Sequence, residues 1–225
     1  MWMLLRWAAR LLVLAAALVG VATLAVGAML AVPLRTPPEL ASISGSARAI
    51  DRSNLPVVQR FQARDGTELG YRAYLPEGSP KRIAILIHGS SGNGTVLNVM
   101  ARQLAAEGIV AIAPDLRGHG VSGTRGDISY IGQLEDDLED IVAHLRRQHG
   151  DSPVALAGHS SGGGFVLRVA TGSRAALFDR FILLAPYLGP FTTTSRPSTG
   201  SARWAEPDIP RIFGLTFLRR VGIPC

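Results

Sequence analysis

The most informative part of this chain is VALAGHSSGGGFVL, residues 154–167. An apolar run of strand length ends in the pentapeptide GHSSG, and an apolar helical pattern begins directly after it. A G-x-S-x-G sequence between a buried strand and a helix is typical of a sharp turn that exposes a serine hydroxyl. The glycines supply the small residues that such a turn and close helix packing require. We therefore expect Ser160 to be a nucleophile, with a purely structural turn as the alternative.

The apolar residues along the chain predict six strands, including the one just described. Alternating polar and apolar residues at 57–63 and 69–75, joined through Asp65-Gly66, predict an antiparallel hairpin. Continuous apolar runs predict strands that are buried on both faces, at residues 83–87, 109–113, 154–157 and 181–185.

Two apolar stripes at helical spacing lie between these runs. They are Val96, Val99, Met100 and Leu104, and then Ile131, Leu134, Leu138, Ile141, Val142 and Leu145. The second helix has acidic residues first and arginines last, which suits the helix dipole. We interpret its acidic run as a solvated face rather than a metal site. The alternation of strands and helices predicts an α/β fold, a mostly parallel sheet with helices on both faces.

The N-terminus carries a separate apolar segment. Residues 11–34 contain no charged side chain, and about 20 apolar residues cross the hydrocarbon core of a bilayer. We favour an uncleaved signal anchor, because the apolar region of a cleaved signal peptide has only about 7–15 residues. A cleaved peptide and a buried core helix are the alternatives. Arg6 and Arg10 before the span favour a cytoplasmic N-terminus and an exported domain.

The net charge of +6 does not indicate a nucleic-acid partner. Residues 51–170 carry 12 basic and 13 acidic residues, so the excess lies in the two ends of the chain. A basic face for phosphate contacts belongs on the folded body. Cys225 is the one cysteine and forms no internal disulfide.

Three motifs in one order resemble the α/β-hydrolase superfamily. Besides the GHSSG pentapeptide, HGSSGN at residues 88–93 resembles the oxyanion loop of that superfamily. DLRGHGVSG at residues 115–123 resembles the loop after the next strand in monoacylglycerol-lipase-like and serine-aminopeptidase-like hydrolases. The resemblance covers about residues 60–190. PRIFGLTFLRR, residues 210–220, is similar to a helical cap inserted after the sixth strand.

The resemblance implies roles for five residues. Ser160 is the nucleophile, and the backbone N–H groups of Ser161 and Ser90 are the oxyanion donors, which suits their positions after strand ends at one edge of the sheet. His88 and Gly89 are binding-site residues that shape the oxyanion loop, and His88 is not the base. An ordinary polar loop at Ser90 is the alternative. We expect Ser160 and the Ser90 amide to border one small cavity. No cofactor is implied, and no metal signature is present.

The acid and base of a catalytic triad are not found in the expected places. In this superfamily they follow the serine in the order Asp or Glu, then His. No histidine follows Ser160, and the acidic residues Asp179, Glu206 and Asp208 do not close a strand. Six strands are predicted where the superfamily has eight. We therefore expect both triad partners to be absent from a chain that is a fragment or is truncated at its C-terminus.

These inferences divide the chain into four segments and suggest two functions. The segments are a transmembrane anchor at residues 1–34, a linker at 35–56, a hydrolase core at 57–190 and a cap-like segment at 191–225. The first function is a single-pass, membrane-anchored serine hydrolase of small-molecule carboxylic esters, including lipid esters, or amides, with its domain outside the cytoplasm. The second is an inactive truncated hydrolase with at most a binding role.

Overall fold

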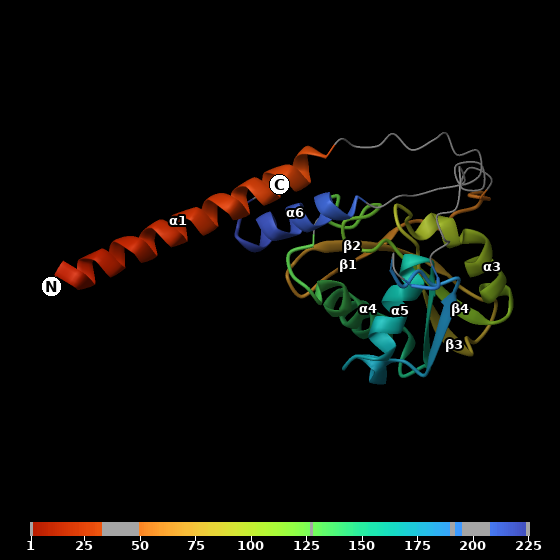
Figure 1. Cartoon of the computed structure of the whole chain (residues 1–225). Helices are drawn as coiled ribbons and strands as arrows, with labels where there is room; N and C mark the ends of the chain where they lie inside the picture. Colours follow the sequence, from red (N-terminus) through yellow and green to blue (C-terminus); the bar gives the residue numbers. More distant parts are fainter. Residues whose placement is uncertain (1, 33–49, 127, 190–191, 195–207, 224–225) are drawn as a thin grey trace. The chain divides into compact units, whose positions relative to one another are not determined.

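The computed structural model forms two compact units, which are residues Met1–Ala41 with Ser198–Cys225, and residues Ser42–Pro197. Figure 1 shows the helices α1 and α6 of the first unit and the sheet with its helices in the second. The residues that the structure describes are 2–32, 50–126, 128–189, 192–194 and 208–223.

The second unit is built on one six-stranded sheet in the order β1-β2-β4-β3-β5-β6. The strands are β1 (Gln59–Gln62), β2 (Glu68–Tyr74), β3 (Arg82–Ile87), β4 (Ile109–Pro114), β5 (Val154–His159) and β6 (Arg180–Leu184). The pairs β3–β4, β3–β5 and β5–β6 are parallel, and β1–β2 and β2–β4 are antiparallel. The predicted hairpin and the mostly parallel sheet are therefore confirmed.

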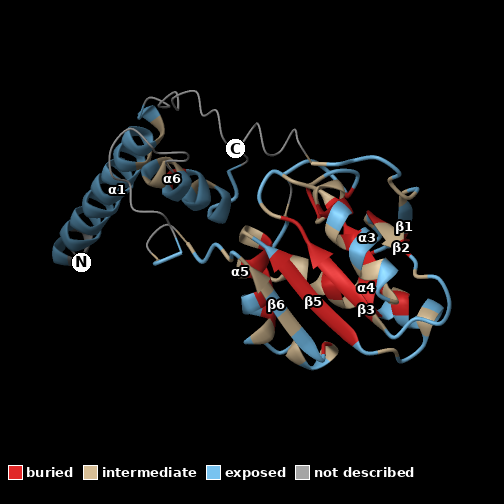
Figure 2. Ribbon diagram, turned by 90° about the vertical axis from the view of Figure 1, so that its right-hand side faces the viewer, coloured by how far each residue is buried: buried red, intermediate tan, exposed pale blue. Residues whose placement is uncertain are grey.

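Helices cover both faces of this sheet. Side chains alternate along a strand, so Ile83 and Ile85 of β3 pack with the helices α4 (Gln133–His149) and α5 (Ser161–Ala170). Ala84 and Leu86 point to the other face, where they pack with α3 (Asn98–Ala106). Short 3-10 turns, η1 (Gly94–Leu97) and η2 (Ala175–Leu177), precede α3 and β6. Figure 2 shows the buried central strands β3 and β5 beside the more exposed β6.

Five large apolar residues of the predicted patterns are exposed: Val57, Leu75, Val99, Ile131 and Ile182, the last of which lies in β6, a strand that is not buried on both faces as predicted. Ile131 is 88% exposed because α4 begins later, after Gly132 has taken a φ of 102° that breaks the helical pattern. Val57 is 85% exposed, since the first strand begins two residues further on. Val99 lies on the outer side of α3. These corrections concern the ends and edges of elements, which local patterns define least well.

The acidic run of α4 faces arginines rather than solvent alone. Three arginines from other elements pair with it: Arg64 with Asp136, Glu139 and Asp140, Arg168 with Glu135, and Arg174 with Asp136 and Glu139. The carboxylates are thus neutralised by side chains of the hairpin turn, of α5 and of the segment after α5. The interpretation as a simply solvated face was incomplete.

The first unit contains two helices within the described residues. The helix α1 (Trp2–Ala31) includes the segment Arg6–Ala31, with a mean hydropathy of 2.5, which is long and apolar enough to cross a membrane. None of that segment is buried against protein. The helix α6 (Ile209–Arg220) falls in the predicted cap-like segment. Most of the remainder of that segment, residues 195–207, lies outside the described residues.

Candidate active site

Ser160 lies at the turn between β5 and α5, where the sequence placed it. Its backbone has φ 56° and ψ −121°, a region that residues with a side chain rarely adopt and that costs on the order of 1–3 kcal/mol. Two hydrogen bonds hold this turn against β6 and the segment after it. Ser160 N donates to Leu184 O at 3.0 Å, and Tyr187 N donates to Ser160 O at 2.8 Å. The strained turn is therefore fixed by the neighbouring strand.

Glycines allow the main chain to pass close to this turn. A Cβ atom on Gly162 would lie 2.5 Å from His88 O and 2.6 Å from Ile87 O. A Cβ on Gly158 would overlap the carbonyl group of Gly162, and one on Gly164 would overlap Tyr187 O. The start of α5 consequently packs directly on the end of β3, which brings the two sequence motifs together.

The loop after β3 lies beside Ser160. A Cβ on Gly89 would be 3.1 Å from Ser160 Cβ and 3.4 Å from His159 O. Ser90 and Ser91 are both exposed. Ser91 has a φ of 57°, so the loop turns sharply at this point. Within the part of the chain that the structure describes, the backbone N–H groups of Ser90 and Ser161 donate to no backbone carbonyl.

His88 connects the loop after β3 with the loop after β4. Its ring is 1% exposed, its Nε2 accepts from Leu116 N at 3.1 Å, and its Nδ1 lies 2.8 Å from Gly89 O. A backbone N–H can only donate, so Nε2 is unprotonated and Nδ1–H donates to the carbonyl. Burial lowers the pKa of His88, which favours this neutral ring. Both ring nitrogens of His88 are therefore occupied within the protein, and the binding role of His88 and Gly89 stays a prediction.

The loop after β4 is held by Asp115 and Arg117 through different partners. Asp115 accepts from Gly94 N at 2.7 Å and from Val121 N at 3.0 Å, so its carboxylate joins two loops. Arg117 instead pairs with Asp137 of α4 and Asp65 of the hairpin turn. Asp115 and Arg117 thus stiffen this loop through separate partners.

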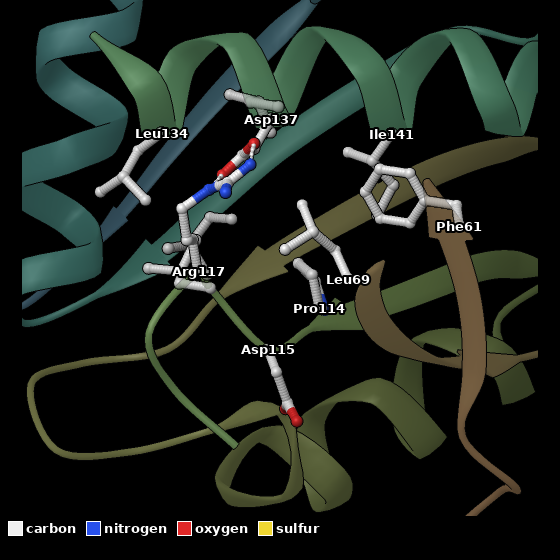
Figure 3. A pocket seen from close by; sticks show the side chains of 11 residues that line it. Phe61, Leu69, Pro114, Asp115, Arg117, Leu134, Asp137 and Ile141 are labelled. Atoms are coloured by element: carbon white, nitrogen blue, oxygen red, sulfur yellow. Dashed lines mark hydrogen bonds and ion pairs between the residues drawn. The ribbon is translucent and has the colours of Figure 1, made fainter. Parts of the chain in front are cut away.

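The cavity shown in Figure 3 lies at a different place from Ser160. Apolar side chains of the hairpin and α4, such as Phe61, Leu69 and Ile141, line it together with Arg117 and Asp137. Burial raises the pKa of Asp137, and the two hydrogen bonds from Arg117 oppose this effect. This is a gap beside a structural ion pair. It does not confirm the expected small cavity between Ser160 and Ser90.

The five histidines of the chain all lie in the described residues, and none is shown as a base for Ser160. His119 Nδ1 lies 3.2 Å from Arg117 O, and its ring contacts His88. His144 Nε2 lies 3.0 Å from the hydroxyl of Tyr71 in the hairpin. His149 ends α4, and His159 is exposed beside the turn. Among the described residues, no hydrogen bond joins a histidine to Ser160 Oγ.

A serine on a strained strand-to-helix turn at the carboxyl edge of a mostly parallel sheet is the defining feature of the α/β-hydrolase class. The chain belongs to the Hydrolase_4 family, described as serine aminopeptidase, S33, whose model matches residues 78–212. It is therefore a hydrolase by lineage.

Relatives with known names are lipases and esterases. The chain is 30% identical to a monoacylglycerol lipase of Mycolicibacterium smegmatis over 107 residues, 47% of this chain and 38% of the relative. It is 26% identical to the monoglyceride lipase of Mus musculus over 152 residues, 66% of this chain and 48% of the relative. The chain thus spans about half the length, or less, of these curated relatives.

Solved structures show the same fold. A soluble variant of monoglyceride lipase from Saccharomyces cerevisiae superposes with a TM-score of 0.51 at 23% identity, over 60% of this chain and 46% of that chain. A thermostable carboxyl esterase from Bacillus coagulans superposes with a TM-score of 0.50 at 25% identity, over 57% of this chain and 44% of that chain.

Proposed function

We propose that this chain carries the nucleophile and the oxyanion donors of a membrane-anchored serine hydrolase that cleaves carboxylic esters. Ser160 Oγ attacks the acyl carbonyl carbon, the alcohol leaves, and water then releases the acid from the acyl-enzyme. The observation that carries this proposal is the strained backbone of Ser160 directly beside Gly89. Such a turn lifts the hydroxyl clear of the sheet and toward a substrate.

The oxyanion of the tetrahedral intermediate is stabilised by two backbone N–H groups. Ser161 N begins α5, where the helix dipole favours negative charge. Ser90 N belongs to the loop that Gly89 places against Ser160. Loss of one such donor lowers turnover by about 10²–10³ in other enzymes. His88 contributes by fixing this loop and not by proton transfer.

The substrate class follows from the relatives and from the membrane anchor. Monoacylglycerol and monoglyceride lipases are among the curated relatives, and α1 suits a bilayer span. We assign lipid esters as the preferred substrates and amides as the alternative. The arginines Arg6 and Arg10 favour a cytoplasmic N-terminus and an extracytoplasmic hydrolase domain.

A second candidate function is binding without catalysis. It is favoured by one observation, the lack of a histidine hydrogen-bonded to Ser160 Oγ among the described residues. A serine hydroxyl needs an adjacent base to act as a nucleophile at neutral pH. The general base and the acid that orients it are therefore left unassigned in this chain.

The test is ester hydrolysis by the complete gene product, whatever its length, in detergent micelles. The substrates are p-nitrophenyl butyrate and a monoacylglycerol. Ser160→Ala should lower turnover by about 10⁴–10⁶. Ser173→Ala, at an exposed serine after α5 and outside the proposed site, is the matched control and should retain activity. Unchanged hydrolysis in Ser160→Ala would contradict the proposal.

The 225-residue chain provides a second comparison. Because none of its described residues is a base hydrogen-bonded to Ser160 Oγ, it should be slower than an active enzyme by about 10⁶. If this chain hydrolyses the ester at a rate that Ser160→Ala abolishes, one of its five histidines serves as the base. If no ester is hydrolysed in either assay, the binding function is favoured.

A further inference from the structure

Two arginines and a tyrosine lie together on the face of the sheet that α3 covers. Arg72 and Tyr74 are two residues apart in β2, so their side chains leave the sheet on the same face. Tyr74 packs with Leu97 and with Ala101 of α3, and Arg102 follows Ala101 directly. All five residues belong to the second unit, so their arrangement is internal to it.

The hydroxyl group of Tyr74 is buried without a hydrogen-bond partner. The residue is 4% exposed, and no group in the described part of the chain bonds to its Oη. Burial raises the pKa of Tyr74, and the charges of Arg72 and Arg102 oppose this effect, so both guanidinium groups lie close to the phenol. Buried hydroxyl groups are nearly always paired, because an unpaired one is unfavourable.

The guanidinium of Arg72 also lacks a partner. Its Nε is buried, and among the residues that the structure describes nothing accepts from it. Arg102 is more exposed, and its Nη1 donates to Asp51 Oδ2 at 3.1 Å. A partly buried cation without an anion is unfavourable. Two arginines thus share one carboxylate, which leaves an excess of positive charge beside the Tyr74 hydroxyl.

Asn98 adds an unpaired acceptor one helical turn before Arg102. It is 0% exposed, and its Nδ2 donates to Asp51 O at 2.9 Å and to Ser53 O at 3.1 Å. Carbonyl oxygens only accept, so these two bonds fix the orientation of the amide. Its Oδ1 is buried and has no partner within the described ranges. A ligand that satisfies the cluster therefore offers oxygens to the guanidinium and the phenol, and a hydroxyl to the amide.

The cluster is separate from the candidate active site. Tyr74 pairs with Ala111 of β4, which lies level with Ala155 of β5 through the register of β3. Ser160 lies five residues beyond Ala155, roughly 16 Å further along the strand direction. Two strands, β4 and β3, also separate β2 from β5. A ligand on the cluster would not touch the serine.

We propose that Arg72, Tyr74 and Asn98 bind a phosphate group, with Arg102 at the entrance. The phosphate oxygens accept from the Arg72 guanidinium and the Tyr74 hydroxyl, and the P–OH of a protonated phosphate donates to Asn98 Oδ1. Two guanidinium groups suit the charge of a phosphate and can bind it with paired hydrogen bonds. A carboxylate has less charge and no hydroxyl to donate. This inference goes beyond the proposed function and does not depend on it.

The test is titration calorimetry on the full chain in detergent micelles and phosphate-free buffer. The probes are inorganic phosphate and dihexanoyl phosphatidic acid, whose headgroup is a phosphate monoester. Arg72→Met and Tyr74→Phe should each weaken binding by about tenfold or more. Arg147→Gln, at an exposed arginine of α4, is the matched control and should bind as the wild type does. Absence of binding by the wild type, or unchanged binding in both site variants, would overturn the inference.

The two probes distinguish a soluble ligand from a lipid. Binding of inorganic phosphate that depends on Arg72 supports a soluble ligand, and such binding of phosphatidic acid alone supports a lipid headgroup. Sulfate has a similar shape but carries no proton at neutral pH, so it should bind several-fold more weakly. Equal affinity for sulfate would contradict the role of Asn98 and the choice of phosphate.

The stability of the chain gives a second readout. In phosphate-free buffer Arg72→Met should raise the urea midpoint of unfolding, because it removes a partly buried charge that has no partner. Added phosphate should then raise the midpoint of the wild type more than that of the variant, since a ligand stabilises only the form that binds it. A lower midpoint for Arg72→Met without phosphate would show that Arg72 is already paired within the protein, and would overturn the inference.

Discussion

The backbone of Ser160 illustrates how single residues at this site are constrained by their neighbours. Its positive φ is unfavourable for serine, yet the hydrogen bonds to Leu184 and Tyr187 and the glycine contacts around it leave little room for another conformation. Strain of this kind persists only where the surrounding structure enforces it. The side chain is thus held at the end of β5 before any substrate binds.

Gly162→Ala should therefore be strongly destabilising. Its Cβ would lie 2.5–2.6 Å from two carbonyl oxygens of β3 and the loop after it, and backbone atoms cannot move away cheaply. We expect a loss of about 2–4 kcal/mol in the free energy of unfolding, measured with urea in detergent micelles. Gly172→Ala is the control, since its nearest neighbour is at 3.2 Å and only a small loss is expected. Equal losses in the two variants would show that the turn is not tightly packed.

His88 should make the stability of the fold sensitive to acid. Its folded pKa lies below the ordinary value of 6.5 because the ring is buried, so the unfolded chain binds the proton first. The contribution of His88 is fully present above pH 6.5 and is lost as the pH falls below that value, by at most about 1.4 kcal/mol per pH unit. The free energy of unfolding between pH 5 and 8 measures this slope. His88→Gln should flatten the slope, and a residual slope is expected from His144, whose pKa burial also lowers.

At the scale of elements, Arg117 joins three parts of the second unit. It is 8% exposed, it donates to Asp137 of α4 at 2.6 and 2.8 Å, and it contacts Asp65 and Thr67 of the hairpin turn. Arg117 lowers the pKa of Asp65 to about 2. Arg117 thus ties the loop after β4 to both the hairpin and α4. The same loop contains Leu116, whose N–H donates to His88.

Arg117→Met should cost about 3–5 kcal/mol in the free energy of unfolding, because it leaves the carboxylate of Asp137 buried and unpaired. The double variant Arg117→Met and Asp137→Leu should recover much of this loss, since no unpaired charge remains. Arg64→Met is the exposed counterpart, with a cost of about 1 kcal/mol or less. A double variant as unstable as the single one would mean that the ion pair itself, rather than the orphaned charge, provides the stability.

At the scale of the whole molecule, the chain combines a hydrolase sheet with an apolar helix that none of its own described residues bury. The segment Arg6–Ala31 has the length and hydropathy of a membrane span, and a span fixes where the enzyme meets its substrate. The proposed membrane span would place the hydrolase domain next to lipid, which agrees with the proposed lipid-ester substrates.

The anchor should keep the chain in the membrane pellet after carbonate washing of a bacterial host. Protease added to spheroplasts should digest the hydrolase domain, since the positive charges favour a cytoplasmic N-terminus. An epitope tag before Trp2 distinguishes the two forms of the segment: an uncleaved anchor retains the tag, and a cleaved signal peptide loses it. A chain found in the soluble fraction with its tag would refute the span, and protection from protease would reverse the orientation.

Local sequence patterns were sufficient for the architecture. The apolar runs marked the strands of the sheet to within two residues at almost every end, and GHSSG and HGSSGN marked the two turns that meet at Ser160. Both signals are local, because the side-chain period of a strand and the conformational freedom of glycine act over a few residues. The family resemblance rested on these same motifs, and the family match confirmed it.

The pairing of charged and polar side chains depended on the tertiary structure. Arg117 and Asp65 are 52 residues apart, and Leu116 donates to a histidine 28 residues earlier. The spacing of the sequence favours Asp115, two residues before Arg117, as its partner over Asp137, which is 20 residues away. Only the packing of α4 against the loop after β4 brings the carboxylate of Asp137 to the guanidinium of Arg117. The carboxylate of Asp115 instead accepts from backbone N–H groups of two loops.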